Sequence, residues 1–439
     1  MDKTPFYLQG NFGPVDDEVE AFDLKVEGEI PEYLEGMFLR NGPNPTRGDP
    51  GHWFFGDGMI HATRLEGGRA SWYRNRYVDT ASRRGAPAMQ LTEDLKFDHT
   101  VGVSNTHVVS HAGKILALVE SSYPAELDRE LNTVGPLDFD GKLTTSFTAH
   151  PKVCAKTGEM LAFGYSALPP FLTYHRISPD GTLVQSEEIE VPASTMMHDF
   201  SVTENHVVFM DLPIVFKAEQ LAAGMPYQWD ASHGARLGVM PRNGSNADVV
   251  WMEIEPCFVF HPMNAYERDG KIVMDVVRYP EFMSGGPLAT DAGELWRWTI
   301  DLAAHIVKEE KLDDRATEFP RIDPRRECLE NRYGYAVLNG SGKGLSFEGL
   351  VKHDLERGTS EVHNFGPGAA PSECVFVPAC PDAAEDEGVV MAYVYHEDTN
   401  ASEFVVLDAQ NFSKPALGRV ALPQRVPFGF HGSWSPDPR

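Results

Sequence analysis

The sequence of 439 residues is poor in basic residues, and this deficit excludes several classes of function. It contains 38 Lys and Arg against 65 Asp and Glu, which gives a net charge of −27. Nucleic acids and anionic membrane surfaces are bound through basic patches, so we expect neither as a partner. The charge says nothing about apolar loops, so peripheral contact of such loops with a membrane stays open.

Cysteine is scarce, and segments that would direct the chain out of the cytoplasm are lacking. The five cysteines form no CxxC pair, and their odd number and scatter predict reduced thiols. The N-terminus has no apolar segment typical of a signal peptide, and no window approaches 18 uncharged apolar residues. These absences predict a cytoplasmic protein. The cysteines are Cys154, Cys257, Cys328, Cys374 and Cys380.

Long helical periodicity is nearly absent, and short strand-like runs bounded by turn residues take its place. Such runs recur from about residue 60 to the C-terminus, and glycine (39) and proline (32) are spread between them. The pattern predicts an all-β fold, a propeller or a large barrel, in one domain over residues 1–439. About seven four-stranded blades would fit the length, although no literal repeat is visible. Representative runs cover residues 114–120, 206–211, 271–277, 373–378, 388–395 and 403–408. One segment, residues 213–224, is amphipathic and predicts a helix.

Four of the sixteen histidines stand where an apolar run meets a turn. They are His150, His198, His261 and His431. Two of them precede proline, which has no N–H and can end a strand ladder while holding the preceding side chain toward a central cavity. Imidazole suits iron, zinc, copper and nickel. Placement alone leaves open whether these residues are metal ligands or ordinary buried histidines.

A metal-bound histidine generally needs a partner for its other ring nitrogen. Glu120, Glu318 and Glu373 stand at similar strand ends and are candidates for that role. Each would be costly to bury without a partner, so a solvated position at a rim is the alternative. We expect the remaining twelve histidines to lie at the surface or to have structural roles. They are His52, His61, His99, His107, His111, His175, His206, His233, His305, His353, His363 and His396.

With these histidines and their neighbours, the chain resembles the carotenoid cleavage oxygenases over nearly its whole length. As a set the matching motifs are highly specific, because they occur in the right order along the chain. They are residues 36–45 (GMFLRNGPNP), 52–61 (HWFFGDGMIH), 105–106 (NT), 149–152 (AHPK), 197–200 (MHDF), 260–262 (FHP), 372–373 (SE) and 423–432 (PQRVPFGFHG).

The resemblance implies a seven-bladed β-propeller with a dome of loops and helices over one face, and a non-haem Fe(II) on its axis. The four histidines named above would be the iron ligands. The matching glutamates, Glu120, Glu318 and Glu373, would orient three of the four rings. Thr106 would lie near the open positions of the iron and help to shape the O2 site. No further cofactor is implied, since the chain has no dinucleotide fingerprint.

The resemblance further implies that O2 adds across a C=C bond of a small apolar conjugated alkene and that both carbons leave as carbonyls. Val119 stands where phenol-selective stilbene cleavers commonly have a lysine, which favours a carotenoid or apocarotenoid over a hydroxystilbene. Three alternatives remain: a stilbene- or phenylpropenoid-cleaving dioxygenase, a non-catalytic lipid-binding propeller, and an isomerase. The sequence determines neither the oligomeric state nor the bond that is cleaved.

Overall fold

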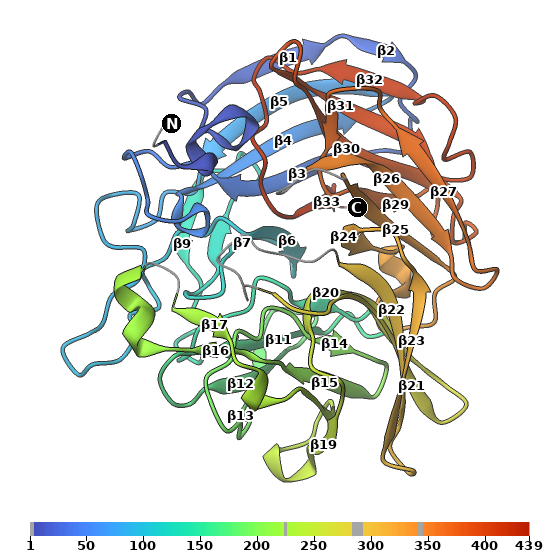
Figure 1. Ribbon diagram of the computed structural model, residues 1–439. Coiled ribbons are helices and arrows are strands. Elements are labelled where there is room, and N and C mark those ends of the chain that lie inside the picture. The colour runs from blue at the N-terminus through green and yellow to red at the C-terminus, as the bar shows by residue number, and fades with distance from the viewer. Residues whose placement is uncertain (1–3, 224–225, 283–292, 341–345, 439) are drawn as a thin grey trace. The chain divides into compact units, whose positions relative to one another are not determined.

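The computed structural model describes residues 4–223, 226–282, 293–340 and 346–438 (Figure 1). Almost all regular structure in these ranges is β-strand, which confirms the all-β prediction. The helices described there are short 3-10 turns, and none is long and apolar enough to cross a bilayer. These turns are η1 (Phe6–Leu8), η2 (Gly10–Phe12), η3 (Trp53–Phe55), η4 (Ala218–Ala223), η5 (Ala231–His233), η6 (Asn246–Asp248) and η7 (Pro324–Arg326).

The chain sorts into two compact units. The first contains Met1–Asp138, Phe347–His353 and Ser360–Arg439, and the second contains Phe139–Ser346 and Asp354–Thr359. The organisation as one domain over residues 1–439 stays a prediction.

Three sheets belong to the first unit. One has the order β1 (Glu20–Leu24), β5 (Arg69–Tyr77), β4 (Gly58–Glu66), β3 (Gly36–Pro43) and β33 (Gly432–Pro436). The next runs through β6 (His107–His111), β7 (Lys114–Leu118), β8 (Ala125–Leu127) and β9 (Thr133–Pro136). The third has the order β2 (Val26–Gly28), β32 (Gly418–Ala421), β31 (Ala401–Asp408), β30 (Gly388–His396) and β28 (Ala369–Pro371), and β29 (Val375–Pro378) also pairs with β30.

Three four-stranded sheets and one hairpin belong to the second unit. The first sheet contains β10 (Lys152–Val153), β11 (Met160–Tyr165), β12 (Leu172–Ile177) and β13 (Leu183–Glu188). The second contains β14 (Ser201–Val202), β15 (His206–Asp211), β18 (Arg236–Pro241) and β19 (Val250–Glu253). The third contains β20 (Phe258–Arg268), β21 (Lys271–Tyr279), β22 (Glu294–Asp301) and β23 (Ile306–Asp313). The hairpin pairs β16 (Ile214–Phe216) with β17 (Tyr227–Trp229).

A further four-stranded sheet runs through β24 (Thr317–Arg321), β25 (Tyr333–Asn339), β26 (Phe347–Asp354) and β27 (Thr359–Asn364). The described residues therefore form seven sheets of at least four strands, in which most neighbours are consecutive and antiparallel. This is the blade pattern of a seven-bladed β-propeller, as predicted. The C-terminal strand β33 closes the pattern on the N-terminal side by pairing antiparallel with β3, from Gly36 opposite Pro436 to Arg40 opposite Gly432.

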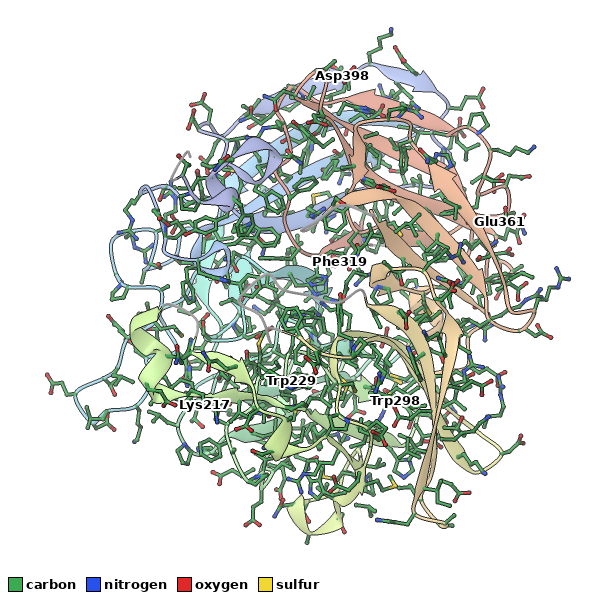
Figure 2. The ribbon with its side chains drawn as sticks, in the orientation of Figure 1. Lys217, Trp229, Trp298, Phe319, Glu361 and Asp398 are labelled. Atoms are coloured by element: carbon green, nitrogen blue, oxygen red, sulfur yellow. The ribbon has the colours of Figure 1, made fainter. Side chains whose placement is uncertain are left out.

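In the sheet of β20 to β23, burial falls from the first two strands to the last, and it explains their sequence patterns. In β21 every residue from Ile272 to Tyr279 is buried, as expected for a strand covered on both faces, and its sequence is a nearly continuous apolar run. The last strand, β23, is largely exposed and rich in charge. Trp298, on β22, is fully buried in the apolar core of this unit (Figure 2).

Most strand predictions are confirmed, but the helix predicted over residues 213–224 is wrong. The apolar run Ile214–Phe216 pairs with Tyr227–Trp229 as a hairpin, and only a 3-10 turn, Ala218–Ala223, follows it. β-Branched and aromatic residues lose rotamer freedom in a helix and fit a pleated sheet better, so the tertiary partner overrides the short helical pattern. Gly224, the predicted helix end, lies outside the described residues.

Candidate metal centre

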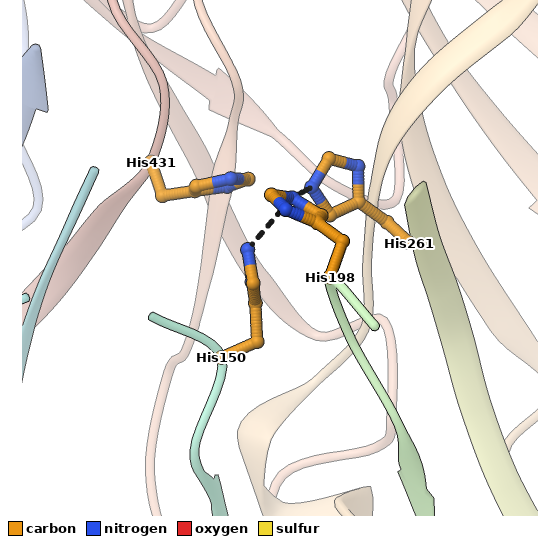
Figure 3. A group of neighbouring side chains, drawn as sticks. All are labelled: His150, His198, His261 and His431. Atoms are coloured by element: carbon orange, nitrogen blue, oxygen red, sulfur yellow. Dashed lines mark hydrogen bonds between the residues drawn. The ribbon is translucent and has the colours of Figure 1, made fainter. Parts of the chain in front are cut away.

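The four predicted histidines come together. One ring nitrogen of each of His150, His198, His261 and His431 lies within 4.8 Å of the corresponding nitrogens of the other three (Figure 3). His198 is half-buried and the other three are buried. Among the residues that the structure describes, this is the only group of histidines, cysteines and carboxylates close enough to hold a metal ion.

The Nε2 atoms of three rings point toward one another. The distance is 3.1 Å between His150 and His198 and 3.2 Å between His198 and His261, as the dashed lines in Figure 3 show. If such a pair subtends a right angle at a shared ion, these separations place the ion about 2.2 Å from each nitrogen, close to the ~2.1 Å typical of metal–imidazole bonds. The residues present therefore fit a transition-metal ion.

Three of the histidines precede a strand at the edge of a sheet, and the fourth lies inside one. His150 precedes β10, His198 precedes β14, and His431 immediately precedes β33. His261 lies inside β20, at a register irregularity between Val259 and Pro262. Proline cannot donate to the ladder, and this accounts for the irregularity that follows the histidine. The prediction that these residues stand where strands meet turns is therefore confirmed for His150, His198 and His431. It is wrong for His261, which lies inside the strand.

A direct hydrogen bond orients the ring of His261. Its Nδ1 donates to Glu318 Oε2 over 2.6 Å, and the hydroxyl of Tyr279 donates to Glu318 Oε1 over 3.0 Å. The backbone N–H of Phe319 also donates to Glu318, and Phe319 adopts a left-handed φ of 54° there. Burial and the carboxylate raise the pKa of Tyr279 well above its usual value, so its hydroxyl stays a neutral donor. Glu318 is thus held on both oxygens.

A similar bond orients His431 in the first unit. Its Nδ1 donates to Glu373 Oε1 over 2.9 Å, and the backbone N–H of Gly432 donates to Glu373 Oε2 over 2.7 Å. Both side chains are buried. The backbone N–H of His431 donates to the carbonyl of Thr106 over 3.1 Å, so Thr106 lies beside the main chain of a predicted ligand. Its role at an O2 site stays a prediction.

These bonds determine which ring nitrogen carries the proton. A neutral imidazole whose Nδ1 donates a proton presents a lone pair at Nε2. His261 and His431 both have this arrangement toward a carboxylate. An imidazole lone pair is the group that a transition-metal ion binds, so these two rings suit metal ligation. Glu120 lies just after β7 and is half-buried, and its role as the orienting partner of a third ring stays a prediction.

A carboxylate close to His150 was missed by the sequence analysis. Asp199 Oδ2 lies 4.0 Å from His150 Nδ1, and the ammonium of Lys152 lies 3.0 Å from Asp199 Oδ1. Burial raises the pKa of Asp199, and Lys152 acts against that rise. Both residues stand in the recognised motifs, next to predicted ligands. The sequence shows a charged residue close to each of these two ligands. It does not show that these charges are taken out of water.

Aromatic rings surround two of the ligands, and no role for them followed from the sequence. Phe260 packs edge-on against His198, with ring centroids 5.0 Å apart, and Phe319 stacks on His261 at 5.4 Å. Phe282 packs edge-on against Phe260 at 4.6 Å. These rings make an apolar surface beside the nitrogens.

Several of the remaining histidines have structural partners, as predicted. His61 bonds to the hydroxyl of Tyr73, His206 to Glu267, and His363 to the carbonyl of Phe412. None of them belongs to the four-residue cluster. The five cysteines all lie among the described residues, and none of them forms a disulfide there.

Comparisons with known proteins agree with this site. Residues 12–436 match the family model described as retinal pigment epithelial membrane protein. The chain is 41% identical to a carotenoid cleavage oxygenase of Mycobacterium tuberculosis, with 98% of this chain and 97% of the relative covered. It is 33% identical to an isoeugenol monooxygenase of Pseudomonas nitroreducens, with 98% of each chain covered. The crystal structure of a lignostilbene dioxygenase of Pseudomonas brassicacearum matches with a TM-score of 0.91 at 30% identity, covering 100% of both chains.

The fold, the histidine cluster and these matches define an oxygenase on a seven-bladed propeller. The chain belongs to the retinal pigment epithelial membrane protein family, which includes the carotenoid cleavage oxygenases. The predictions of the family, of the propeller and of an oxygenase activity are confirmed.

Proposed function

We propose that the protein is an Fe(II)-dependent dioxygenase that cleaves a C=C bond of a carotenoid, an apocarotenoid or a related conjugated alkene. The observation that carries the proposal is the convergence of imidazole nitrogens, at 3.1 and 3.2 Å, in a largely buried site. His150, His198, His261 and His431 would hold the iron. Four neutral ligands leave the iron its full charge, and a six-coordinate ion would keep two positions open.

Bound there, Fe(II) would supply the activation of O2. Overall, both atoms of O2 enter the substrate, the C=C bond breaks, and each carbon leaves as a carbonyl. The alkene supplies the electrons, so no external reductant is needed. The residues of the chain orient the ligands through Glu318 and Glu373 and present aromatic side chains, among them Phe260, to an apolar substrate.

Two features support this substrate class. Phe260 and Phe282 form a ring-lined surface beside His198, which suits a flat conjugated chain. Val119, half-buried directly after β7, offers no charge to a phenol. Both features favour a polyene or apocarotenoid.

A stilbene or phenylpropenoid is the second candidate substrate. It is supported by the lignostilbene dioxygenase and the isoeugenol monooxygenase among the relatives, both of which align over almost the whole chain. The first of these names describes a dioxygenase and the second a monooxygenase. The number of oxygen atoms that enter the products therefore has to be measured.

The test is to load the purified protein with Fe(II) without air and add air-saturated buffer with a panel of apocarotenoids, 4-hydroxystilbenes and isoeugenol. We expect O2 uptake and aldehyde products from at least one polyene, each carrying one atom of ¹⁸O when ¹⁸O2 is used. Uptake only with the phenols would transfer the proposal to the second candidate. No uptake with any compound, in protein that holds about one iron per chain, would refute it.

A further inference from the structure

Two charged side chains link the segments that carry His150 and His198. Lys152 comes two residues after His150, and Asp199 follows His198 directly. The Lys152 ammonium lies 3.0 Å from Asp199 Oδ1 and 3.1 Å from Oδ2, so it bridges both oxygens. The pair therefore links the two segments that carry these histidines, whose Nε2 atoms lie 3.1 Å apart.

The pair is buried. The side chain of Asp199 is 2% exposed and that of Lys152 is 16% exposed. Asp199 Oδ1 also accepts the N–H of Phe200 over 2.7 Å. Taking two charges out of water is expensive, and removing one of them leaves the other uncompensated, so a buried pair of this kind is sensitive to the loss of either member.

The carboxylate also faces the imidazole of His150. Its Oδ2 lies 4.0 Å from His150 Nδ1, too far for a hydrogen bond. A negative charge at that place still favours the tautomer with the proton on Nδ1, because the N–H dipole then points toward the carboxylate. That tautomer leaves the lone pair of Nε2 directed toward His198, where the other nitrogens converge.

A second pair joins the same two segments without these properties. Lys156 and Glu204 form a salt bridge, but their side chains are 59% and 38% exposed. It lies close in sequence to the first pair, and exposed pairs contribute little to stability. Lys156 and Glu204 are thus matched control positions, because they form the same type of ion pair between the same two segments.

We propose that Lys152 and Asp199 are positioning residues for the metal centre. They fix the spacing of His150 and His198 and select the tautomer of His150, and they act as one unit. This inference rests on the proposed metal site, since it concerns two of its four ligands. In this proposal the pair orients the ring of His150, as Glu318 orients the ring of His261.

The test is a metal titration of the purified full chain. Metal-free protein is titrated without air with Co(II), whose visible spectrum reports coordination, and in parallel with Fe(II). The variants are Asp199→Asn, Lys152→Met and the double variant, with Lys156→Met and Glu204→Gln as controls. Thermal unfolding of each metal-free variant separates loss of fold from loss of positioning.

We expect Co(II) to bind roughly 10-fold or more weakly to either single variant, within the range known for partners of metal-bound histidines. The visible spectrum of the bound ion should change in both. The double variant should bind about as weakly as the single ones, because the pair acts as a unit. The control variants should bind like the unaltered protein and keep its spectrum.

Three results would overturn the inference. The first is unaltered affinity and spectrum in Asp199→Asn, the second is tighter binding in Lys152→Met, and the third is an equal loss in the exposed control pair. If one single variant fails to fold, the other single variant and the double variant decide. A failure of the unaltered protein to bind either metal would instead refute the proposed function, so the two failures are distinguishable.

Discussion

His261 and His150, two of the proposed metal ligands, are held in two different ways. His261 lies within strand β20 and donates directly to Glu318 at 2.6 Å, and a neutral Tyr279 hydroxyl supports the carboxylate. His150 lies before the two-residue strand β10 and faces Asp199 at 4.0 Å, and a lysine ammonium binds that carboxylate. One ring is held by a hydrogen bond on a long strand, and the other by the charge of a buried ion pair.

The difference shows that a set of chemically equal ligands need not have equal surroundings. A long strand with many ladder bonds holds a side chain firmly, and a short hydrogen bond then suffices to fix its ring. A ligand on a short strand needs a link to another segment, and the Lys152–Asp199 pair supplies one. We therefore expect the two arrangements to respond differently when they are disturbed.

The largest effect should come from removing a ring. His198→Ala should abolish stoichiometric iron binding and activity, because His198 lies at 3.1 and 3.2 Å from the nitrogens of both compared ligands. Iron content after reconstitution without air measures this, with circular dichroism as the check on the fold. A variant that keeps about one iron per chain would contradict the ligand assignment.

Glu318→Gln should have the next largest effect and should exceed that of Asp199→Asn. The amide can still accept one hydrogen bond, but it removes the charge that lies 2.6 Å from His261. We expect metal affinity to fall by up to about 100-fold, the upper end for such partners. Titration with Co(II) measures the loss. A loss smaller than that of Asp199→Asn would mean that the ion pair contributes more to metal binding than the direct hydrogen bond does.

Tyr279→Phe should give a smaller loss on the His261 side. It removes one neutral donor, 3.0 Å from Glu318, and leaves the ring in place. A buried carboxylate that loses such a bond costs about 1–3 kcal/mol. Unfolding of the metal-free protein in urea measures the loss of stability. The metal titration measures the accompanying loss of metal affinity. Unchanged values in both would show that Glu318 needs no second donor.

The smallest effect should come from the exposed pair. Lys156→Met should change the free energy of unfolding by less than about 1 kcal/mol, because an exposed salt bridge is screened by solvent. Urea unfolding at low and high salt checks this. A large, salt-insensitive loss would mean that the two segments are held together by the exposed pair rather than by Lys152 and Asp199.

The fold class was readable from the sequence because it depends on short-range patterns. Apolar runs such as 206–211 and 388–395 are long enough to specify strands, and the turns between them are marked by glycine. The segment 213–224 failed because its helical spacing is short and its true partner, Tyr227–Trp229, lies beyond it. Pairing of this kind is a tertiary property.

The four histidines and Glu373 were named from the sequence because they stand in motifs that resemble a known family, and Glu318 was named because it stands at a similar strand end. Those motifs also contain Lys152 and Asp199, yet nothing in them distinguishes a buried ion pair from two solvated charges. Only packing decides that difference, since the same two side chains in water would attract each other weakly.

By itself the sequence determined an acidic all-β oxygenase with four histidines in the order of its family. Only the tertiary structure decided how those rings are held, because the partners of a ring come from segments tens of residues away. Tyr279 and Glu318 are 39 residues apart and Lys152 and Asp199 are 47 apart. Distances of about 3 Å between such groups are set by the paired strands, and no local pattern encodes them.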